Sequence, residues 1–159
     1  MIISISGTPG TGKTRLAKKL AKDLKFKYID GNKVISLHHL RESHDSKRMC
    51  HIIDVNKFSR AVLDMVLGNS IVDSHLSHHL KKAGLCIVCR SELAKLKKRL
   101  EKRGYPPSKV RENLDAEIFE VCLSEAIELG QTVIIHKGDY AKTLKKVRAY
   151  CSGIRRNAS

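Results

Sequence analysis

The chain has 159 residues, of which 42% are apolar, and it carries 31 Lys and Arg against 16 Asp and Glu, a formal net charge of +15. This length suits one well-buried domain and excludes two ordinary ones, and the sequence lacks the run of about 18 apolar residues that a membrane-spanning helix needs. The strong positive charge indicates a polyanionic partner such as nucleic acid, although a solvated Lys-rich surface has the same composition.

Short β-rich segments alternate along the chain with helical patterns. The segments that read as strands, apolar on both faces as buried parallel strands are, cover residues 2–6, 26–29, 70–74, 85–89 and 132–136. The patterns that read as helices cover residues 13–24, 54–67, 76–83, 91–102, 110–129 and 139–151. This alternation predicts an α/β fold of three layers, in which helices cover both faces of a parallel sheet.

Some segments depart from this alternation. Residues 36–51 are polar and rich in His, and residues 103–109 contain paired prolines, so both are predicted to be mobile excursions from the core. The basic tail, residues 152–159, is predicted to be frayed. Within 110–129, apolar residues at helical spacing predict a buried helix face made of Leu114, Ile118, Val121, Cys122 and Ile127.

The most specific motif is GTPGTGKT at residues 7–14, which fits G-x-x-x-x-G-K-[ST] and joins a hydrophobic strand directly to a helix. Gly7, Gly10 and Gly12 let successive N–H groups face inward, and the helix that follows presents its positive end to phosphate oxygens. Lys13 is predicted to reach the β- and γ-phosphates, and the hydroxyl of Thr14 to bind Mg²⁺. The motif therefore predicts a site for ATP and magnesium.

A second motif, SIVDSHL at residues 70–76, ends an apolar strand that is predicted to lie next to the first one. Asp73 is a candidate for holding Mg²⁺ through water. His75 follows just past the strand end, where ligands gather in open α/β sheets, and could orient an attacking water or contact the γ-phosphate. The alternative is that Asp73 and His75 cap the next helix.

A third motif, KRLEKRGYPPSKVREN at residues 98–113, is a basic helix end followed by a turn and more basic residues. In a phosphotransferase, such a segment closes over the triphosphate, excludes water and supplies arginine to the developing charge. Arg103 is the first candidate for that arginine, and Arg99 or Arg111 the second. A solvated turn between helices is the alternative.

The cysteines and histidines do not predict a metal centre. The five cysteines are scattered and odd in number, and the N-terminal MIISISG lacks the charged region of a signal peptide, which together predict a soluble cytoplasmic protein with reduced thiols. Cys86 and Cys89 lie in the apolar run LCIVC and are predicted to be strand thiols. A polar helix face, rather than a zinc site, is predicted for the HxxHH at His75, His78 and His79, and zinc is likewise not predicted at His38, His39, His44 and His51.

Taken together, GTPGTGKT, IVDSH and RLEKRGYPPSKVRENLDAEIFE resemble the adenylate kinase isoenzyme 6 family, which comprises coilin-interacting nuclear ATPases and their archaeal relatives. The resemblance spans most of the chain, and its most specific pieces are TPGTGKT, the D-x-H of Asp73 and His75, and RGY followed by N-x-x-x-EIF at 113–119. It implies an adenylate-kinase-like P-loop NTPase fold with a five-stranded parallel sheet. It also implies a monophosphate-binding region near residues 30–53 and a short lid near residues 102–112.

The resemblance implies an activity and partners as well. Members are described as broad nucleoside monophosphate kinases that also hydrolyse ATP and act in late maturation of the small ribosomal subunit. The implied ligands and partners are ATP, Mg²⁺, AMP or another nucleoside monophosphate, a ribosomal protein of the uS11 type and pre-ribosomal RNA. The expected nucleotide-binding residues are Gly7, Gly10, Thr11, Gly12, Lys13, Thr14, Arg15 and Arg103, the expected catalytic residues are Lys13, Asp73, His75 and Arg103, and the expected metal ligands are Thr14 and Asp73.

The sequence departs from the family pattern in the monophosphate region. Where the family commonly has an arginine, this chain has Ser36, and Lys33 or Arg41 is the candidate replacement. Binding of the AMP phosphate needs a well-placed cation, so the sequence supports kinase activity less strongly than it supports ATPase activity. An ATPase assembly factor without significant kinase activity is therefore an alternative, and so is a small-metabolite kinase of the shikimate kinase type.

Overall fold

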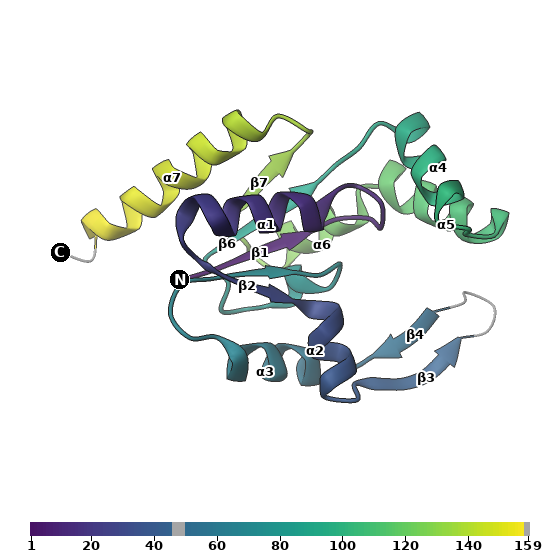
Figure 1. The fold of residues 1–159 in the computed structure, drawn as a ribbon, viewed down its shortest axis with the longest axis horizontal. Coiled ribbons are helices and arrows are strands. Elements are labelled where there is room, and N and C mark those ends of the chain that lie inside the picture. Colours follow the sequence, from purple (N-terminus) through teal and green to yellow (C-terminus); the bar gives the residue numbers. More distant parts are fainter. Residues whose placement is uncertain (46–49, 158–159) are drawn as a thin grey trace.

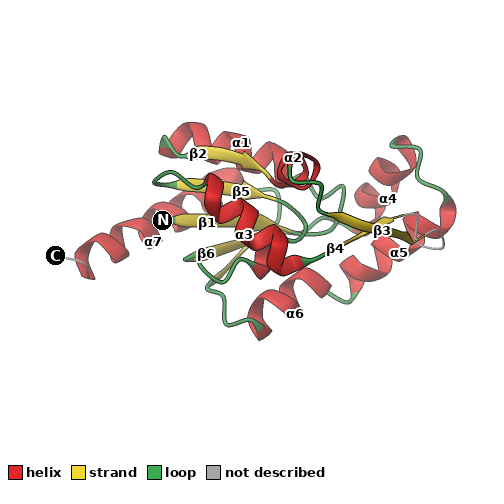
Figure 2. Cartoon of the chain, turned by 90° about the horizontal axis from the view of Figure 1, so that it is seen from below, coloured by secondary structure: helices red, strands yellow, loops and turns green. Residues whose placement is uncertain are grey.

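The computed structural model describes residues 1–45 and 50–157, with side chains for residues 1–42 and 52–154. In this part of the chain, five parallel strands form one sheet in the order β2-β5-β1-β6-β7 (Figures 1 and 2). These strands are β1 (Ile2–Ser6), β2 (Lys27–Asp30), β5 (Ser70–Asp73), β6 (Leu85–Cys89) and β7 (Val133–His136). All the strands predicted from the sequence are confirmed, and β1 lies between β5 and β6.

Helices cover both faces of this sheet, which confirms the three-layer α/β prediction (Figure 1). On one face, α1 (Lys13–Leu24) and α7 (Tyr140–Asn157) pack with Ile3 and Ile5 of β1. On the other face, α3 (Val55–Met65) packs with Ile2 and Val72, and α6 (Val121–Glu128) packs with Cys86 and Val88. The alternation of side chains along each strand thus feeds two separate hydrophobic cores.

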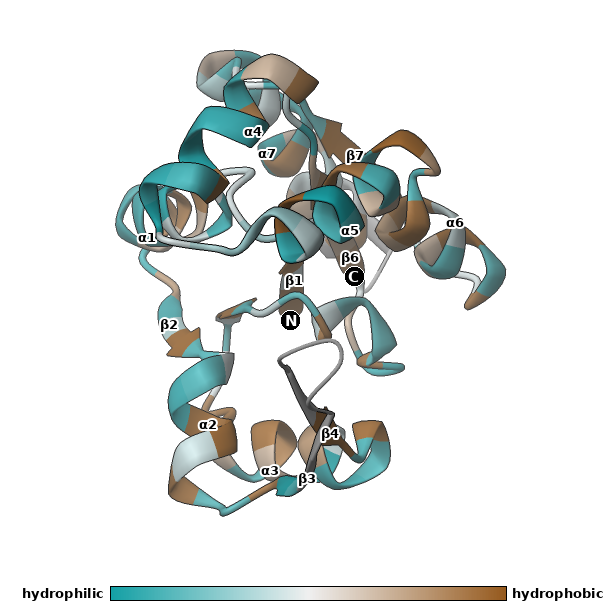
Figure 3. Cartoon of the chain, turned by 90° about the vertical axis from the view of Figure 1, so that its right-hand side faces the viewer, coloured by the Kyte–Doolittle hydropathy of each residue, from teal (hydrophilic) through white to brown (hydrophobic). Residues whose placement is uncertain are grey.

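Two further groups of elements lie beyond the carboxyl ends of the strands. After β2 come α2 (Gly31–Leu37) and an antiparallel hairpin of β3 (Arg41–Asp45) and β4 (Cys50–Ile53). After β6 come α4 (Leu93–Lys102) and α5 (Pro107–Ile118). Figure 3 shows the α4–α5 pair at one end of the molecule and the α2, β3 and β4 group at the other.

Local signals explain where these added helices begin. The side chain of Asp30 accepts hydrogen bonds from the backbone N–H groups of Asn32, at 3.0 Å, and Lys33, at 3.4 Å, and so caps α2. Pro107 occupies the first turn of α5, where its missing N–H costs no helical hydrogen bond. The paired prolines therefore start a helix directly after the turn.

The predicted helix at 76–83 is wrong. The chain there forms only a short 3₁₀ turn, η1 (Ser77–His79). The hydroxyl of Ser77 lies 2.9 Å from the carbonyl of Ile5 and 2.8 Å from that of Ser74, which ties the turn to the end of β1. Competition from such a serine side chain is a known reason for a helix not to form.

The predicted helix at 110–129 is divided, and its predicted buried face is wrong in part, since Leu114 and Cys122 are half-buried against the core whereas Ile118, Val121 and Ile127 are exposed. Glu120 has the left-handed backbone angle φ 55°, which separates α5 from α6. Ile118 is 51% exposed and Ile127 is 60% exposed, because the break turns the two helices to different faces. The fully buried residues are Val110, Asn113, Glu117, Leu123 and Ala126.

The prediction of a frayed tail is also wrong up to Asn157, since α7 continues to that residue. The predicted excursion at 36–51 contains the end of α2 and most of the β3–β4 hairpin, although residues 46–49 lie outside the described part. Across the described residues, no helix has the length and apolar content to cross a lipid bilayer.

Candidate active site

The loop that joins β1 to α1 needs glycine at two positions where its backbone lies close to other residues. Gly7 has φ 135°, and a Cβ there would lie 2.4 Å from the carbonyl oxygen of Cys89. Gly10 has φ 91°, and a Cβ there would lie 2.9 Å from a methyl carbon of Leu96. Side chains at either position would meet both a strained backbone and a packed neighbour. The loop can therefore turn in this way only with glycine.

The side chain of Lys13 folds back over this loop. Its Nζ donates hydrogen bonds to the carbonyl oxygens of Gly7, at 2.8 Å, and Thr8, at 3.0 Å. Burial lowers the pKa of the Lys13 ammonium most strongly, while neighbours that include the Asp73 carboxylate act in the opposite direction. The ammonium is thus held at the loop, where a bound phosphate would compete with the two carbonyls for it.

A larger and a smaller cavity flank the loop. The larger has a volume of about 730 Å³ and the smaller about 400 Å³. Both are lined by Gly10, Gly12, Arg15 and Arg103, so the loop and these two arginines stand between them. The larger cavity brings together residues from the loop, from α2, from the end of β5 and from α5, among them Lys13, Thr14, Asn32, Asp73, His75, Tyr105, Lys109 and Asn113.

Asp73 and Thr14 line the larger cavity together. Asp73 ends β5 beside Ile5 of β1, as predicted, and is 5% exposed. The hydroxyl of Tyr28 donates to Oδ2 of Asp73 at 3.1 Å, and burial, followed by the charge of Asp73, raises the pKa of Tyr28. A carboxylate and a hydroxyl at one cavity wall are oxygen donors of the kind that Mg²⁺ accepts.

His75 lies at the same cavity, and its side chain is exposed to solvent. Partial desolvation and the nearby charge of Lys13 both lower the pKa of His75, which favours the neutral ring, although solvent at an exposed side chain weakens the first effect. Neither Asp73 nor His75 caps η1, since the N–H of Leu76 bonds to the hydroxyl of Ser74. The capping alternative is therefore wrong in this described segment.

The three candidate arginines occupy different places. Arg103 lines both cavities. Arg99 lines the smaller one and donates to the carbonyl oxygen of Gly10 at 3.1 Å. Arg111 instead pairs with Asp115 at 2.9 Å on the exposed surface of α5, and it is not among the described residues around either cavity.

Glu117 is a residue of this region whose role the sequence did not indicate. Its carboxylate is 2% exposed and accepts hydrogen bonds from the hydroxyl of Thr8 at 2.6 Å, from Nε of Arg90 at 2.9 Å and from the N–H of Ser91 at 2.9 Å. It thereby ties the loop to the segment after β6 and to α5. The only sequence signal was its place in the EIF element at 117–119.

On the α2 side of the larger cavity, the cations named from the sequence do not line the wall. Asn32 lines the cavity, but Lys33 and Arg41, both described, do not. A guanidinium nitrogen of Arg41 lies 3.5 Å from the hydroxyl of Ser36, so these two residues do meet, on the outer side of α2. Lys109 of α5 and Arg103 are the basic residues that reach the cavity from across it.

The CxxC pair behaves as predicted. Cys86 and Cys89 are fully buried on opposite faces of β6, Cys86 with α6 and Cys89 with α1 and α7. Burial raises the pKa of Cys86 to about 11 and that of Cys89 to about 12, so both are thiols at neutral pH.

The polar helix face predicted for the histidines is wrong, because His78 is 2% exposed and His75 faces the cavity. The side chains of His44 and His51 lie outside the described ones.

Residues 3–120 match a family described as AAA domain. The chain is 38% identical to a protein of Methanosarcina acetivorans named "Putative adenylate kinase", over 80% of this chain and 72% of that protein. It is 39% identical to the "Adenylate kinase isoenzyme 6 homolog" of Dictyostelium discoideum, over 78% of this chain and 73% of that protein. The chain belongs to the adenylate kinase isoenzyme 6 family. It is therefore a phosphotransferase that binds a nucleotide.

Solved structures agree on the fold. The YorR protein of Bacillus subtilis, crystallised with phosphorylated GDP, superimposes with a TM-score of 0.66 at 16% identity and covers 98% of each chain. Shikimate kinase from Acinetobacter baumannii, crystallised with shikimate, gives a TM-score of 0.60 at 14% identity and covers 96% of this chain and 93% of that one. At such low identity these matches establish the P-loop kinase fold, while the family comes from the sequence relatives.

Proposed function

We propose that this chain transfers the γ-phosphoryl group of ATP to AMP or another nucleoside monophosphate, and to water when no acceptor is bound. One observation carries the proposal: the cavity beside the glycine loop is lined by Lys13, Thr14, Asp73, His75 and Arg103 together. These are the groups that phosphoryl transfer needs, since its catalysis consists mainly of positioning and charge neutralisation.

ATP would lie along both cavities. The nucleoside would lie in the smaller one, beside Gly138 and Tyr140, and the phosphates would cross the loop between Gly10 and Gly12. The backbone N–H groups of the loop and Thr11 at its centre would hold the phosphates. Lys13 would leave the carbonyls it now contacts and pair with the β- and γ-phosphate oxygens, with Arg15 beside it.

In the larger cavity, Thr14 and Asp73 would hold Mg²⁺. One oxygen of Asp73 accepts from Tyr28, which leaves the other for a water of the ion's shell. When bound, the ion neutralises charge that develops on the β- and γ-phosphates. The neutral ring of His75 at the same wall can accept a hydrogen bond from a water molecule and so position it.

The acceptor would enter from the side of α2. We propose residues 30–53 as the monophosphate-binding region, with Asn32 at the cavity, and residues 102–112 as the lid, with Arg103 placed against the transferring phosphoryl group. Lys109 and Tyr105, which line the cavity from the lid side, would meet the acceptor phosphate and close off water.

An ATP-consumption assay with and without AMP tests this proposal. The wild-type chain should make two ADP for each ATP used when AMP is present, and Lys13→Ala should lower the rate by about 10²–10³-fold. ATP loss that is independent of AMP but still depends on Lys13 would favour an ATPase without significant kinase activity. Turnover unaffected by Lys13→Ala would contradict both, and phosphorylation of shikimate in place of AMP would favour the small-metabolite alternative.

We also propose that the enzyme acts in late maturation of the small ribosomal subunit, on a ribosomal protein of the uS11 type bound to pre-ribosomal RNA. The net charge of +15 supports a polyanionic partner, and exposed lysines line α4 at Lys95, Lys97, Lys98 and Lys102. Purified chain should retain the uS11-type protein, with an affinity that changes between ATP and ADP. Equal retention of an unrelated basic ribosomal protein would contradict this role.

A further inference from the structure

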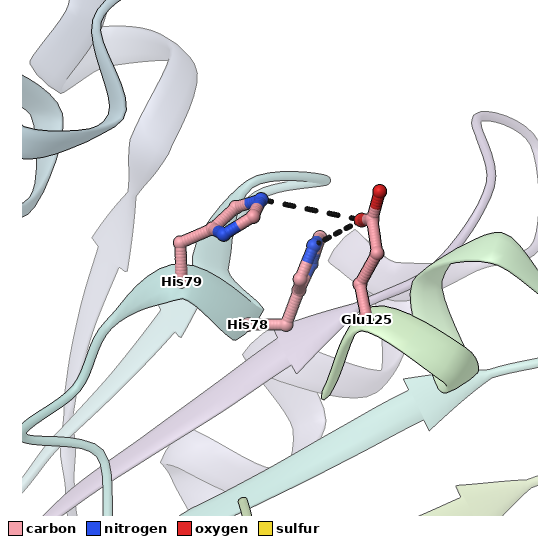
Figure 4. Close-up of side chains that lie close together, drawn as sticks. All are labelled: His78, His79 and Glu125. Carbon is pink, nitrogen blue, oxygen red and sulfur yellow. Dashed lines mark hydrogen bonds and ion pairs between the residues drawn. The ribbon is translucent and has the colours of Figure 1, made fainter. Parts of the chain in front are cut away.

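A cluster of two histidines and one carboxylate lies away from the residues assigned to nucleotide binding. His78 and His79 belong to η1, and Glu125, 47 positions after His78, belongs to α6 (Figure 4). Nε2 of His78 lies 2.7 Å from Oε2 of Glu125, and Nε2 of His79 lies 4.0 Å from the same oxygen. The ligand atoms of all three residues lie within 4.8 Å of one another.

The ring of His78 is held in the orientation that a metal ligand needs. Its Nδ1 lies 2.7 Å from the hydroxyl of Ser6, and that hydroxyl donates to the carbonyl oxygen of His75 at 3.2 Å. When the hydroxyl of Ser6 donates to the carbonyl of His75, Nδ1 donates to Ser6. The other ring nitrogen, Nε2, faces Oε2 of Glu125, and a proton between them makes a hydrogen bond. A metal ion can replace that proton and bind both atoms.

We propose that His78, His79 and Glu125 bind one divalent transition-metal ion of the Zn²⁺ type, with water as the fourth ligand. Imidazole nitrogens with one carboxylate suit Zn²⁺, whereas Mg²⁺ prefers oxygen donors throughout. The hydrogen bond of Nδ1 to Ser6 supplies the outer-shell partner that metal-binding histidines have.

The cluster can accommodate the ion with a small movement. With ligand bonds of about 2.0–2.1 Å in a tetrahedral site, adjacent ligand atoms lie about 3.3 Å apart. The His78–Glu125 distance of 2.7 Å must therefore open, and the His79–Glu125 distance of 4.0 Å must close, each by less than about 1 Å. The side chain of Glu125 is 43% exposed and that of His79 is 25% exposed, which gives the carboxylate room to rotate and the ion a path from solvent. The backbone of His78 is held by Gln131, whose side-chain amide donates to the His78 carbonyl oxygen at 3.1 Å.

An occupied site would link two parts of the enzyme. It would join η1, which follows the end of β5, to α6, which follows the lid helix α5. Ser6, the partner of His78, directly precedes Gly7 of the nucleotide-binding loop. A metal ion that binds the folded chain and not the unfolded one would raise the temperature of the unfolding midpoint. The increase would grow with the logarithm of the ratio of metal concentration to dissociation constant.

Competition of the nucleotide-free, tag-free chain against a chromophoric zinc chelator tests the proposal. We expect one Zn²⁺ per chain, and Glu125→Gln and His79→Ala should each weaken binding at least about tenfold. Matched controls are Glu128→Gln, on the same helix, and His38→Ala, an exposed histidine at the end of α2, which should bind Zn²⁺ as the wild type does. No saturable binding, or equal binding by Glu125→Gln, would overturn the proposal.

X-ray absorption at the zinc edge separates this site from cysteine binding. The spectrum should show a first shell of nitrogen and oxygen, with imidazole scattering and no sulfur. Sulfur ligands would place the ion at the cysteines and would overturn the assignment. The two variants lie at partly exposed side chains, so circular dichroism should show them folded, and the test does not depend on phosphotransfer.

Discussion

The two ends of the proposed reaction site are built very differently. The proposed ATP end stands at the carboxyl ends of buried strands. Asp73, at the end of β5, is 5% exposed, and Glu117, on α5, is 2% exposed and bonded to three partners. The acceptor end consists of α2 and the β3–β4 hairpin, where Asn32, Lys33, Ser36 and Arg41 are exposed. One end is fixed by the core, and the other is attached to it by a short capped helix.

This difference explains which properties follow from the fold. Buried groups that are fully hydrogen-bonded have a single low-energy arrangement, so the ATP end is organised before any nucleotide arrives. Exposed side chains on α2 can adopt several arrangements, and the acceptor can select among them. Substitutions at the ATP end should therefore change turnover or stability, and substitutions at the acceptor end should change the Michaelis constant.

Arg103→Ala should have a larger effect than any substitution at the acceptor end. Removal of a positive charge placed against the transferring group costs about a hundredfold or more in turnover. Steady-state kinetics with AMP and without it should both show the loss, because Arg103 lines both cavities. Arg111→Ala is the control, since that arginine pairs with Asp115 at the surface, and an equal loss there would remove Arg103 from its proposed role.

Glu117→Gln should lower the free energy of unfolding by about 3 kcal/mol. The substitution removes the charge that faces Arg90 and replaces one carboxylate oxygen by an NH₂ donor, which must face either the hydroxyl of Thr8 or the N–H groups of Arg90 and Ser91. Urea denaturation measures the change. Glu101→Gln, which removes only the exposed contact to Lys97 at 3.9 Å, should cost well under 1 kcal/mol. Equal losses in both variants would contradict a role for Glu117 in holding the loop.

Asn32→Ala should have the smallest effect and should act on the acceptor alone. Loss of one hydrogen bond to the monophosphate is expected to raise the Michaelis constant for AMP about tenfold, with the ATPase rate unchanged. Lys33→Ala, at the next position of α2 but outside the cavity lining, should change it less than twofold. The reverse order would show that Lys33 supplies the cation that the family pattern lacks at Ser36.

The sequence predicted the strands around the glycine loop better than the helices that follow them. The positions of GTPGTGKT and Asp73 depend on which strands are neighbours in the sheet. The alternation of strands and helices along the sequence is enough to predict those neighbours. The helix at 76–83 failed because Ser77 bonds to β1, a contact made across 72 positions. The buried face at 110–129 failed because one residue, Glu120, adopts a left-handed conformation that no local signal marks.

Other parts of the site depend on contacts between distant residues and so could not be predicted. Thr8 and Glu117 are 109 positions apart and meet only because α5 returns over the loop. The same holds for His78 and Glu125, which are 47 positions apart. The histidine pattern has no carboxylate close to it in the sequence, so the sequence did not predict a metal site there.

The central claim is that one continuous site holds the donor and the acceptor together. Diadenosine pentaphosphate, which joins two adenosines through five phosphates, should occupy both ends at once, and titration calorimetry compares its dissociation constant with that of ATP. Linking two binding events predicts that it binds at least about a hundredfold more tightly than ATP, and that Asn32→Ala reduces this advantage. Binding no tighter than that of ATP would contradict a shared site for donor and acceptor.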